Sequence, residues 1–337
     1  MQKNTALVIT SISGPNQPLR LYADACRERG IDFIVIGDVT SPEDFTLKGC
    51  DFWSIARQST LPFKLARIIP ERHYARKNLG YLRAISQGAA TILETDDDNL
   101  PRPGFWSERS PVQTGSVLSE AGWVNVYACF TDSLIWPRGF PLERVKQGQP
   151  PLSSFPLEEK LCPIQQGLAD ENPDIDAIYR LLLPMPFVFE KPARVILDRN
   201  SWCPFNSQNT TWFKAAFPLL YLPSFCSFRM TDIWRSFVAQ RICWENGWSV
   251  LFHEPTVWQE RNEHNLMRDF TDEIPGYVNN LRICEALADL DLRAGERHMP
   301  DNMIRCYQSL IGQGLVDEGE LPLLDAWLDD VVCAVTS

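Results

Sequence analysis

The stretch from Ala75 to Asn99 constrains the fold of this 337-residue chain more than any other part of the sequence. Leu79, Leu82 and Ile85 recur at helical spacing, and a glycine follows where that helix should end. Residues 91–93 then form a short apolar run, which is typical of a strand buried on both faces. A helix followed at once by a buried strand predicts an α/β fold, with a mostly parallel sheet flanked by helices.

Three consecutive aspartates, Asp96, Asp97 and Asp98, follow this predicted strand directly. Ligands in open α/β sheets bind outside the carboxyl ends of the strands, so these side chains should face a cleft. Adjacent carboxylates repel one another, and a divalent cation such as Mn²⁺ or Mg²⁺ prefers oxygen ligands of this kind. The alternative is a solvated acidic turn, because Asp and Asn are common in loops. We favour a metal site.

The beginning of the chain predicts a β-α-β unit. Residues 6–10 and 33–37 have the character of buried strands, and the segment between them has helical spacing. The two strands should be parallel, with a right-handed crossover. Asp38 follows the second strand, where it either hydrogen-bonds a ribose or base or caps a helix or turn. No G-x-G-x-x-G motif is present, so a dinucleotide site is not predicted.

Charge and composition exclude several classes of protein. The formal net charge of −11 argues against nonspecific binding to nucleic acid. Ten cysteines without a C-x-x-C pair indicate reduced thiols rather than a disulfide framework or a zinc site. No apolar run approaches the ~20 residues that cross a bilayer, so no transmembrane segment is predicted. We expect a soluble, cytoplasmic protein.

A basic segment precedes the aspartates in this acidic chain. It contains five cations, which are Lys64, Arg67, Arg72, Arg76 and Lys77. Basic side chains of this kind hold diphosphates, although each could instead belong to a solvated helix face. We favour Arg76 and Lys77 as the diphosphate ligands.

The pattern becomes helical after Pro275, and this change suggests a division of the chain. Residues 1–275 should form the α/β body, and residues 276–337 a C-terminal helical appendage. The apolar stripes of these helices should pack in a core or at an interface, and a homo-oligomer could form through them.

Several blocks of the sequence occur in the same order in a known family. They are ARKNLGYLRAI, ILETDDDN, WPRGFPL, QQGLADENPDIDAIYRL, NSQNTTWF and FRMTDIWRSFVAQR. Over roughly residues 5–270 the chain resembles the STELLO-type glycosyltransferases and, more distantly, the reversibly glycosylated polypeptides, which are UDP-arabinopyranose mutases. The resemblance implies a GT-A-like fold, a nucleotide-sugar ligand and a metal site of the DxD type.

The resemblance also implies roles for individual residues. Asp96 and Asp98 match the outer positions of the metal motif, and we favour His264 over His253 as a third ligand because its loop is polar. Arg138 matches the arginine associated with reversible glycosylation in the mutases. Asp232 matches an acidic residue that precedes the acceptor-side helix in related folds, where it would act as a base, cap the helix, or do both.

The predicted function is metal-dependent transfer of a sugar from a nucleoside-diphosphate sugar, with a UDP-sugar as the expected donor, to a carbohydrate or glycan-precursor acceptor. The alternatives are a nucleotide-sugar mutase and a noncatalytic scaffold. Asp232 and Arg138 are the predicted catalytic residues. The residues predicted to bind the nucleotide sugar are Ser11, Asp38, Lys64, Arg76, Lys77, Asn78, Asp97, Asp174, Asp176 and Asn209.

Overall fold

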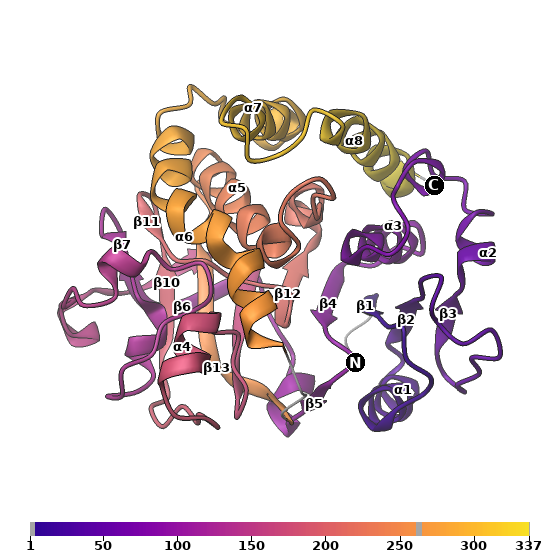
Figure 1. Ribbon diagram of the computed structural model, residues 1–337, viewed down its shortest axis with the longest axis horizontal. Coiled ribbons are helices and arrows are strands. Elements are labelled where there is room, and N and C mark those ends of the chain that lie inside the picture. The colour runs from indigo at the N-terminus through magenta and orange to yellow at the C-terminus, as the bar shows by residue number, and fades with distance from the viewer. Residues whose placement is uncertain (1–3, 261–264, 337) are drawn as a thin grey trace.

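The computed structural model describes residues 4–260 and 265–336, and a mixed sheet with helices on both faces forms its centre (Figure 1). The strand order is β3-β2-β1-β4-β12-β9-β13-β10-β6-β8, and β5 pairs with β13. The strands of this sheet are β1 (Thr5–Thr10), β2 (Asp32–Ile36), β3 (Asp51–Trp53), β4 (Thr91–Thr95), β5 (Asn99–Pro101), β6 (Val112–Leu118), β8 (Leu157–Leu161), β9 (Ile164–Asp170), β10 (Arg194–Leu197), β12 (Asn209–Phe213) and β13 (Val250–Gln259). A separate pair consists of β7 (Gly122–Trp123) and β11 (Ser201–Trp202).

The α-helices are α1 (Gln17–Arg29), α2 (Ile55–Gln58), α3 (Lys77–Ser86), α4 (Ala177–Leu182), α5 (Thr231–Glu245), α6 (Leu266–Ala288), α7 (Met299–Gly312) and α8 (Glu320–Thr336). The α/β class predicted from the sequence is confirmed. Strands β1 and β2 are parallel, as predicted, and β3 and β4 continue the parallel part of the sheet on either side of them. Beyond β4 the sheet is mixed, because β12 runs antiparallel to both β4 and β9.

The parallel part of the sheet is covered on both faces. Helix α1 lies on one face and α3 on the opposite face (Figure 1). The side chain of Asn16 accepts the Leu19 N–H at the start of α1, and Gly30 ends the helix with a left-handed φ of 67°. Strands covered in this way expose their side chains only at their ends, where the loops begin.

Helix α3 approaches the sheet unusually closely through Gly80. A Cβ atom at this position would lie 2.6 Å from Val8 Cγ1 and 2.9 Å from Ile36 Cγ1, so a larger residue would push the helix outward. The close approach buries the first turn of α3 completely, and Lys77 is 0% exposed there. Gly80 thus packs α3 against β1 and β2, and Lys77 in its first turn reaches the Thr95 carbonyl at the end of β4.

The C-terminal helices form additional layers over one face of the sheet. Helix α5 is buried along almost its whole length, and α7 and α8 lie outside α5 and α3 (Figure 1). One apolar core contains side chains of α3, α5, α7 and α8. The predicted division after residue 275 falls inside α6, which begins at Leu266 and continues through Pro275. None of the helices in the described ranges combines the length and apolar character that a bilayer span requires.

Candidate active site

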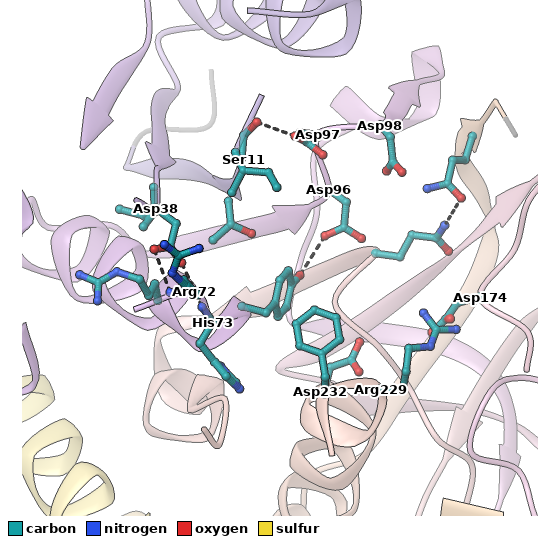
Figure 2. Close-up of a pocket in the computed structure, with 18 of the residues that line it drawn as sticks. Ser11, Asp38, Arg72, His73, Asp96, Asp97, Asp98, Asp174, Arg229 and Asp232 are labelled. Carbon is teal, nitrogen blue, oxygen red and sulfur yellow. Dashed lines mark hydrogen bonds between the residues drawn. The ribbon is translucent and has the colours of Figure 1, made fainter. Parts of the chain in front are cut away.

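A cavity of about 500 Å³ opens at the carboxyl ends of β1, β2 and β4 (Figure 2). One wall carries Ser11 after β1, Asp38 after β2 and the aspartate turn 96–98 after β4. The other wall comes from the second half of the chain and includes Asp174 and Asp232. Figure 2 shows the aspartate turn on one side of the cavity, with Asp174 and Asp232 on the other.

Asp96 is the first residue after β4, and two groups beneath the turn hold its carboxylate. The Tyr74 hydroxyl donates to Asp96 Oδ1 at 2.8 Å, and Lys77 Nζ lies 3.4 Å from the same oxygen. Lys77 also donates to the carbonyl of Thr95 at 2.9 Å. Burial raises the pKa of Asp96 to about 7; Lys77 opposes this shift, and the nearby charge of Asp98 adds to it. A cation bound beside Asp96 would favour its ionised form.

Asp97 shapes the turn instead of facing the cavity freely. Its carboxylate accepts the Ser11 hydroxyl, and its backbone carbonyl accepts Asn16 Nδ2 at 2.7 Å. Burial raises the pKa of Asp97, although the Ser11 hydrogen bond lowers it. These contacts tie the turn after β4 to the loop after β1. Asp96 and Asp98, on either side of Asp97, are the other two carboxylates of the turn.

The opposite wall is organised around Arg138, which lies between two buried carboxylates. Its guanidinium donates to both oxygens of Asp174, at 2.7 and 2.8 Å, and to Asp232 at 3.0 Å. It also donates to the backbone carbonyl of Arg229. Burial alone would lower the pKa of Arg138, but the two carboxylates outweigh it and raise the pKa well above its usual value. Arg138 therefore stays protonated.

Asp232 does not cap its helix, so that part of the sequence interpretation is wrong. Helix α5 begins at Thr231, and no side chain caps its first turn. The Asp232 carboxylate instead accepts the backbone N–H and the hydroxyl of Ser207, at 3.1 and 3.0 Å, together with Arg138. Burial would raise the pKa of Asp232, but Arg138 and Arg235 reverse the shift and lower it. The carboxylate is thus held ionised at the cavity.

The rim of the cavity is a loop fixed by Asp38. Its two oxygens accept the backbone N–H groups of Arg72 and His73, at 2.9 and 3.0 Å, so the residue caps this loop. The Arg72 side chain is exposed at the rim, and it lines the cavity. Phe228 is 54% exposed opposite the loop, with its ring edge-on to His73 and Tyr74. The rim thus offers one solvated cation and one apolar ring.

Several residues predicted to bind the nucleotide sugar make structural contacts away from the cavity lining. Lys64 is exposed and pairs with Asp329 of α8. Asn78 exchanges two hydrogen bonds with the backbone of Leu222. Asn209 joins β12 to β9 and β13 through the Leu168 carbonyl and the Thr256 hydroxyl. These assignments find no support in the position of the side chains.

Three further predicted residues lie near the cavity but turn their polar groups elsewhere. Arg76 lines the wall, yet its guanidinium donates to Gln58 and to two backbone carbonyls. Lys77 lies beneath Asp96 and is absent from the lining. Asp176 caps α4 by accepting the Tyr179 N–H. The two favoured diphosphate ligands, Arg76 and Lys77, are therefore fully engaged inside the protein.

The predicted third metal ligand cannot be placed, because His264 lies outside the described residues. The other candidate, His253, is buried, and its Nδ1 contacts the Glu254 carbonyl at 2.9 Å. Burial lowers its pKa to about 3. Within residues 4–260 and 265–336, no three His, Cys, Asp or Glu side chains are grouped to hold a metal ion. Asp96 and Asp98 would have to share a cation with ligand oxygens.

The structure adds cavity residues that the sequence analysis did not select. They include Tyr74, Asn172, Arg180, Gln208, Phe228, Arg229, Gln259 and Asp269. Most of them stand inside or beside the blocks that carry the family resemblance, so their position in those blocks was the available signal. Asn172, Gln208 and Gln259 form an amide cluster, with Asn172 donating to Gln259 at 2.6 Å. Amide groups of this kind can hydrogen-bond sugar hydroxyls.

Comparison with known proteins confirms the resemblance predicted from the sequence blocks. A family model described as STELLO glycosyltransferases matches residues 229–335, a range that includes α5, α6 and α7 and nearly all of α8. The chain is 28% identical to "Probable glycosyltransferase STELLO2" of Arabidopsis thaliana and 27% identical to "Probable glycosyltransferase STELLO1" of the same plant. Each alignment covers 97% of this chain but only 44% of the relative. The chain thus spans less than half the length of these relatives.

Proposed function

We propose that the protein is a glycosyltransferase that moves a sugar from a nucleoside-diphosphate sugar, of the UDP type, to a hydroxyl of a carbohydrate acceptor. One observation carries the proposal: Asp96, Asp98 and an ionised Asp232 line the same cavity at the carboxyl ends of the strands. The similarity to the STELLO glycosyltransferases supports it. A cavity of this size is within the range of small-molecule sites.

The donor end of the cavity would contain Mn²⁺ or Mg²⁺. Asp96 and Asp98 supply carboxylate oxygens, and Mg²⁺ commonly uses one or two carboxylates together with substrate phosphates. The cation, when bound, neutralises charge on the leaving diphosphate. Asp97 holds the turn between the two proposed ligands against Ser11.

Arg72 replaces Arg76 and Lys77 in the proposed binding of the diphosphate. Its backbone is fixed by Asp38, while its guanidinium is exposed at the rim of the cavity. A guanidinium can bind two phosphate oxygens at once. Lys77 has a different part, because its buried charge compensates Asp96 from below.

Asp232 is the proposed general base of an inverting reaction. The acceptor oxygen attacks the anomeric carbon as the bond to the diphosphate breaks, and its proton passes to the Asp232 carboxylate. Arg138 and Ser207 keep this carboxylate ionised and oriented. A base with a lowered pKa is weaker, but it is available at every physiological pH. Arg138 acts here as a positioning residue.

The mutase alternative, which rests on Arg138, gains nothing from its surroundings. A guanidinium between two carboxylates, with a further bond to a backbone carbonyl, is a poor nucleophile toward a sugar. A mutase would interconvert ring forms of a UDP-sugar without any acceptor. Chromatography that detects this interconversion, and its loss in Arg138→Ala, would favour the mutase over the transferase.

The proposal is tested by thermal unfolding with UDP-sugars, in the presence and absence of Mn²⁺. A ligand at 100 times its Kd adds about 2.7 kcal/mol to the unfolding free energy, which raises Tm measurably. Asp96→Asn combined with Asp98→Asn should abolish the Mn²⁺-dependent part of that rise. The matched control is Asp289→Asn with Asp291→Asn, an exposed pair with the same spacing at the end of α6. Equal stabilisation of the cavity variant and the control would contradict the metal assignment.

A further inference from the structure

Five polar groups connect the two walls of the cavity in a continuous chain. Lys77 Nζ donates to the Tyr74 hydroxyl at 2.7 Å, and that hydroxyl lies 2.8 Å from both Asp96 Oδ1 and Ser207 Oγ. Ser207 Oγ in turn lies 3.0 Å from Asp232 Oδ2. The chain therefore runs from the proposed cation ligand to the proposed base.

This chain has fewer protons than contacts. When both carboxylates are ionised, the three oxygen–oxygen contacts among Asp96, Tyr74, Ser207 and Asp232 share only two hydroxyl protons. Lys77 cannot supply the missing one, because it donates to the Tyr74 oxygen, whose own proton must then point elsewhere. In this ionisation state, one of the three contacts at a time brings two oxygen atoms together without a hydrogen bond. The hydroxyl of Tyr74 can therefore donate to Asp96 or to Ser207, but not to both.

We propose that Tyr74 is a positioning residue with two donor states, which couples cation binding at Asp96 to the fixation of Asp232. Asp96, when it holds a cation, would be a poorer acceptor for the Tyr74 hydroxyl, and the Tyr74 proton would then turn to Ser207. Ser207 then donates its own proton to Asp232, so the proposed base always has this hydrogen-bond donor. The inference rests on the proposed cation site. It predicts that cation binding at Asp96 fixes the orientation of the Asp232 carboxylate.

Ser207 is the informative residue for a test, because it contacts Tyr74 and Asp232 but makes no hydrogen bond to Asp96. Removing its hydroxyl deprives Tyr74 of the second acceptor, so a cation must displace Tyr74 from Asp96 without compensation. The Tyr74→Phe variant keeps the ring beside Phe228 and removes the coupling proton. Ser236 provides the matched control, since it is equally buried and donates only to the Ile233 carbonyl in its own helix.

The experiment is a double-mutant cycle on Mn²⁺ affinity, read from the electron paramagnetic resonance of free Mn²⁺. It uses the full chain at pH 8 with saturating UDP. Ser207→Ala should weaken Mn²⁺ binding about 2- to 12-fold, which is the range expected for one net hydrogen bond. The same change in the Tyr74→Phe background should leave the Kd unchanged, and Ser236→Ala should leave it unchanged in both backgrounds.

The possible outcomes separate the coupling from the proposed function. Mn²⁺ binding with equal Ser207→Ala effects in the two backgrounds, or with none in either, would overturn the coupling alone. A wild-type protein that binds no Mn²⁺ with UDP would overturn the cation site and the coupling together. If Ser207→Ala does not fold, Ser207→Cys replaces it, because a thiol keeps the side-chain volume but is a weak acceptor.

Discussion

One buried cluster of carboxylate and arginine lies in the core of this protein, and another lies in the wall of the cavity. In the core, Arg235 donates to both oxygens of Glu94, which also accept the Tyr81 hydroxyl and the Trp212 indole at 2.8 Å. In the cavity wall, Arg138 joins Asp174 and Asp232. Glu94 is 0% exposed and Asp232 is 7% exposed, so burial alone does not distinguish the two clusters.

The difference lies in where each carboxylate stands relative to the end of a strand. Glu94 is inside β4, between two neighbouring strands, and each of its oxygens is saturated by protein donors. Asp96 comes only two residues later, where the chain has left the sheet, and Asp232 faces it across the cavity. A buried carboxylate therefore stabilises the fold inside β4, whereas the carboxylates beyond the end of the strand line the cavity and are available to a ligand.

The largest expected effect comes from Glu94→Gln, which breaks the core cluster of Glu94 and Arg235. Removing one partner of a buried ion pair leaves the other charge uncompensated, which typically costs about 3–5 kcal/mol of unfolding free energy. Urea unfolding should show this loss, while UDP-sugar affinity of the folded protein stays unchanged. Glu190→Gln, at an exposed position, is the control. A loss below about 1 kcal/mol would mean that the core cluster contributes no more than a surface pair.

Asp232→Asn, in the cavity cluster, should instead act mainly on turnover. The amide cannot accept a proton from the acceptor, and general-base contributions are typically about 10²–10⁴-fold, so we expect turnover at least about a hundredfold slower. Arg138 retains Asp174, and the unfolding free energy should therefore fall less than in Glu94→Gln. Steady-state kinetics and donor affinity measured on the same preparation check the prediction. Near-normal turnover would remove Asp232 as the base and favour a retaining mechanism.

The comparison also shows what sequence could predict. Strand β4 and the aspartate turn were predictable because their signal is local: an apolar run that ends in three carboxylates. The family resemblance was predicted from blocks in a fixed order and is confirmed. Asp96, Asp98 and Asp232 belong to two of those blocks, and all three line one cavity. The role of each residue stays a prediction.

Side-chain direction was the part that sequence could not give. Arg76, Lys77 and Asn78 are adjacent, but neighbours at the start of a helix point about 100° apart, so they cannot all reach one ligand. They bind Gln58, Asp96 and Leu222 instead. The first turn of α5 gave a similar error, because its beginning at Thr231 places Asp232 inside the helix, where its side chain faces Ser207. Such directions depend on tertiary packing.

A third carboxylate shows what happens when no arginine is present. Asp176 is 0% exposed, and its donors are the Tyr179 N–H and the Trp136 indole, both uncharged. Burial raises its pKa to about 6, although these hydrogen bonds oppose the shift. The folded state then holds its proton more tightly than the unfolded state, so this residue lowers the unfolding free energy as pH rises from about 4 to 6. The paired Asp232 has the opposite shift.

Asp176→Asn should remove this pH dependence while keeping the helix cap, because Asn caps about as well as Asp. Urea unfolding of wild type and variant at intervals from pH 4 to pH 7 measures the effect. The unfolding free energy of the wild type relative to the variant should decline by roughly 2 kcal/mol across that range. A difference that does not change with pH would show that Asp176 ionises normally in the folded protein.

The smallest effect is expected at an exposed ion pair, the one between Lys64 and Asp329. Both side chains are solvated, so the pair should contribute little, and Asp330 still accepts the backbone N–H groups of residues 64 and 65 when Lys64 is removed. Lys64→Ala should therefore change neither Tm nor UDP affinity in the presence of Mn²⁺. Arg72→Ala is the matched comparison, because Arg72 is also an exposed cation but lies at the rim of the cavity, and this change should weaken UDP binding. Calorimetric titration of the two variants measures the loss of UDP affinity. Equal losses would restore Lys64 as a diphosphate ligand. A position at the rim of the cavity would then no longer distinguish cations that bind the ligand from cations that only pair on the surface.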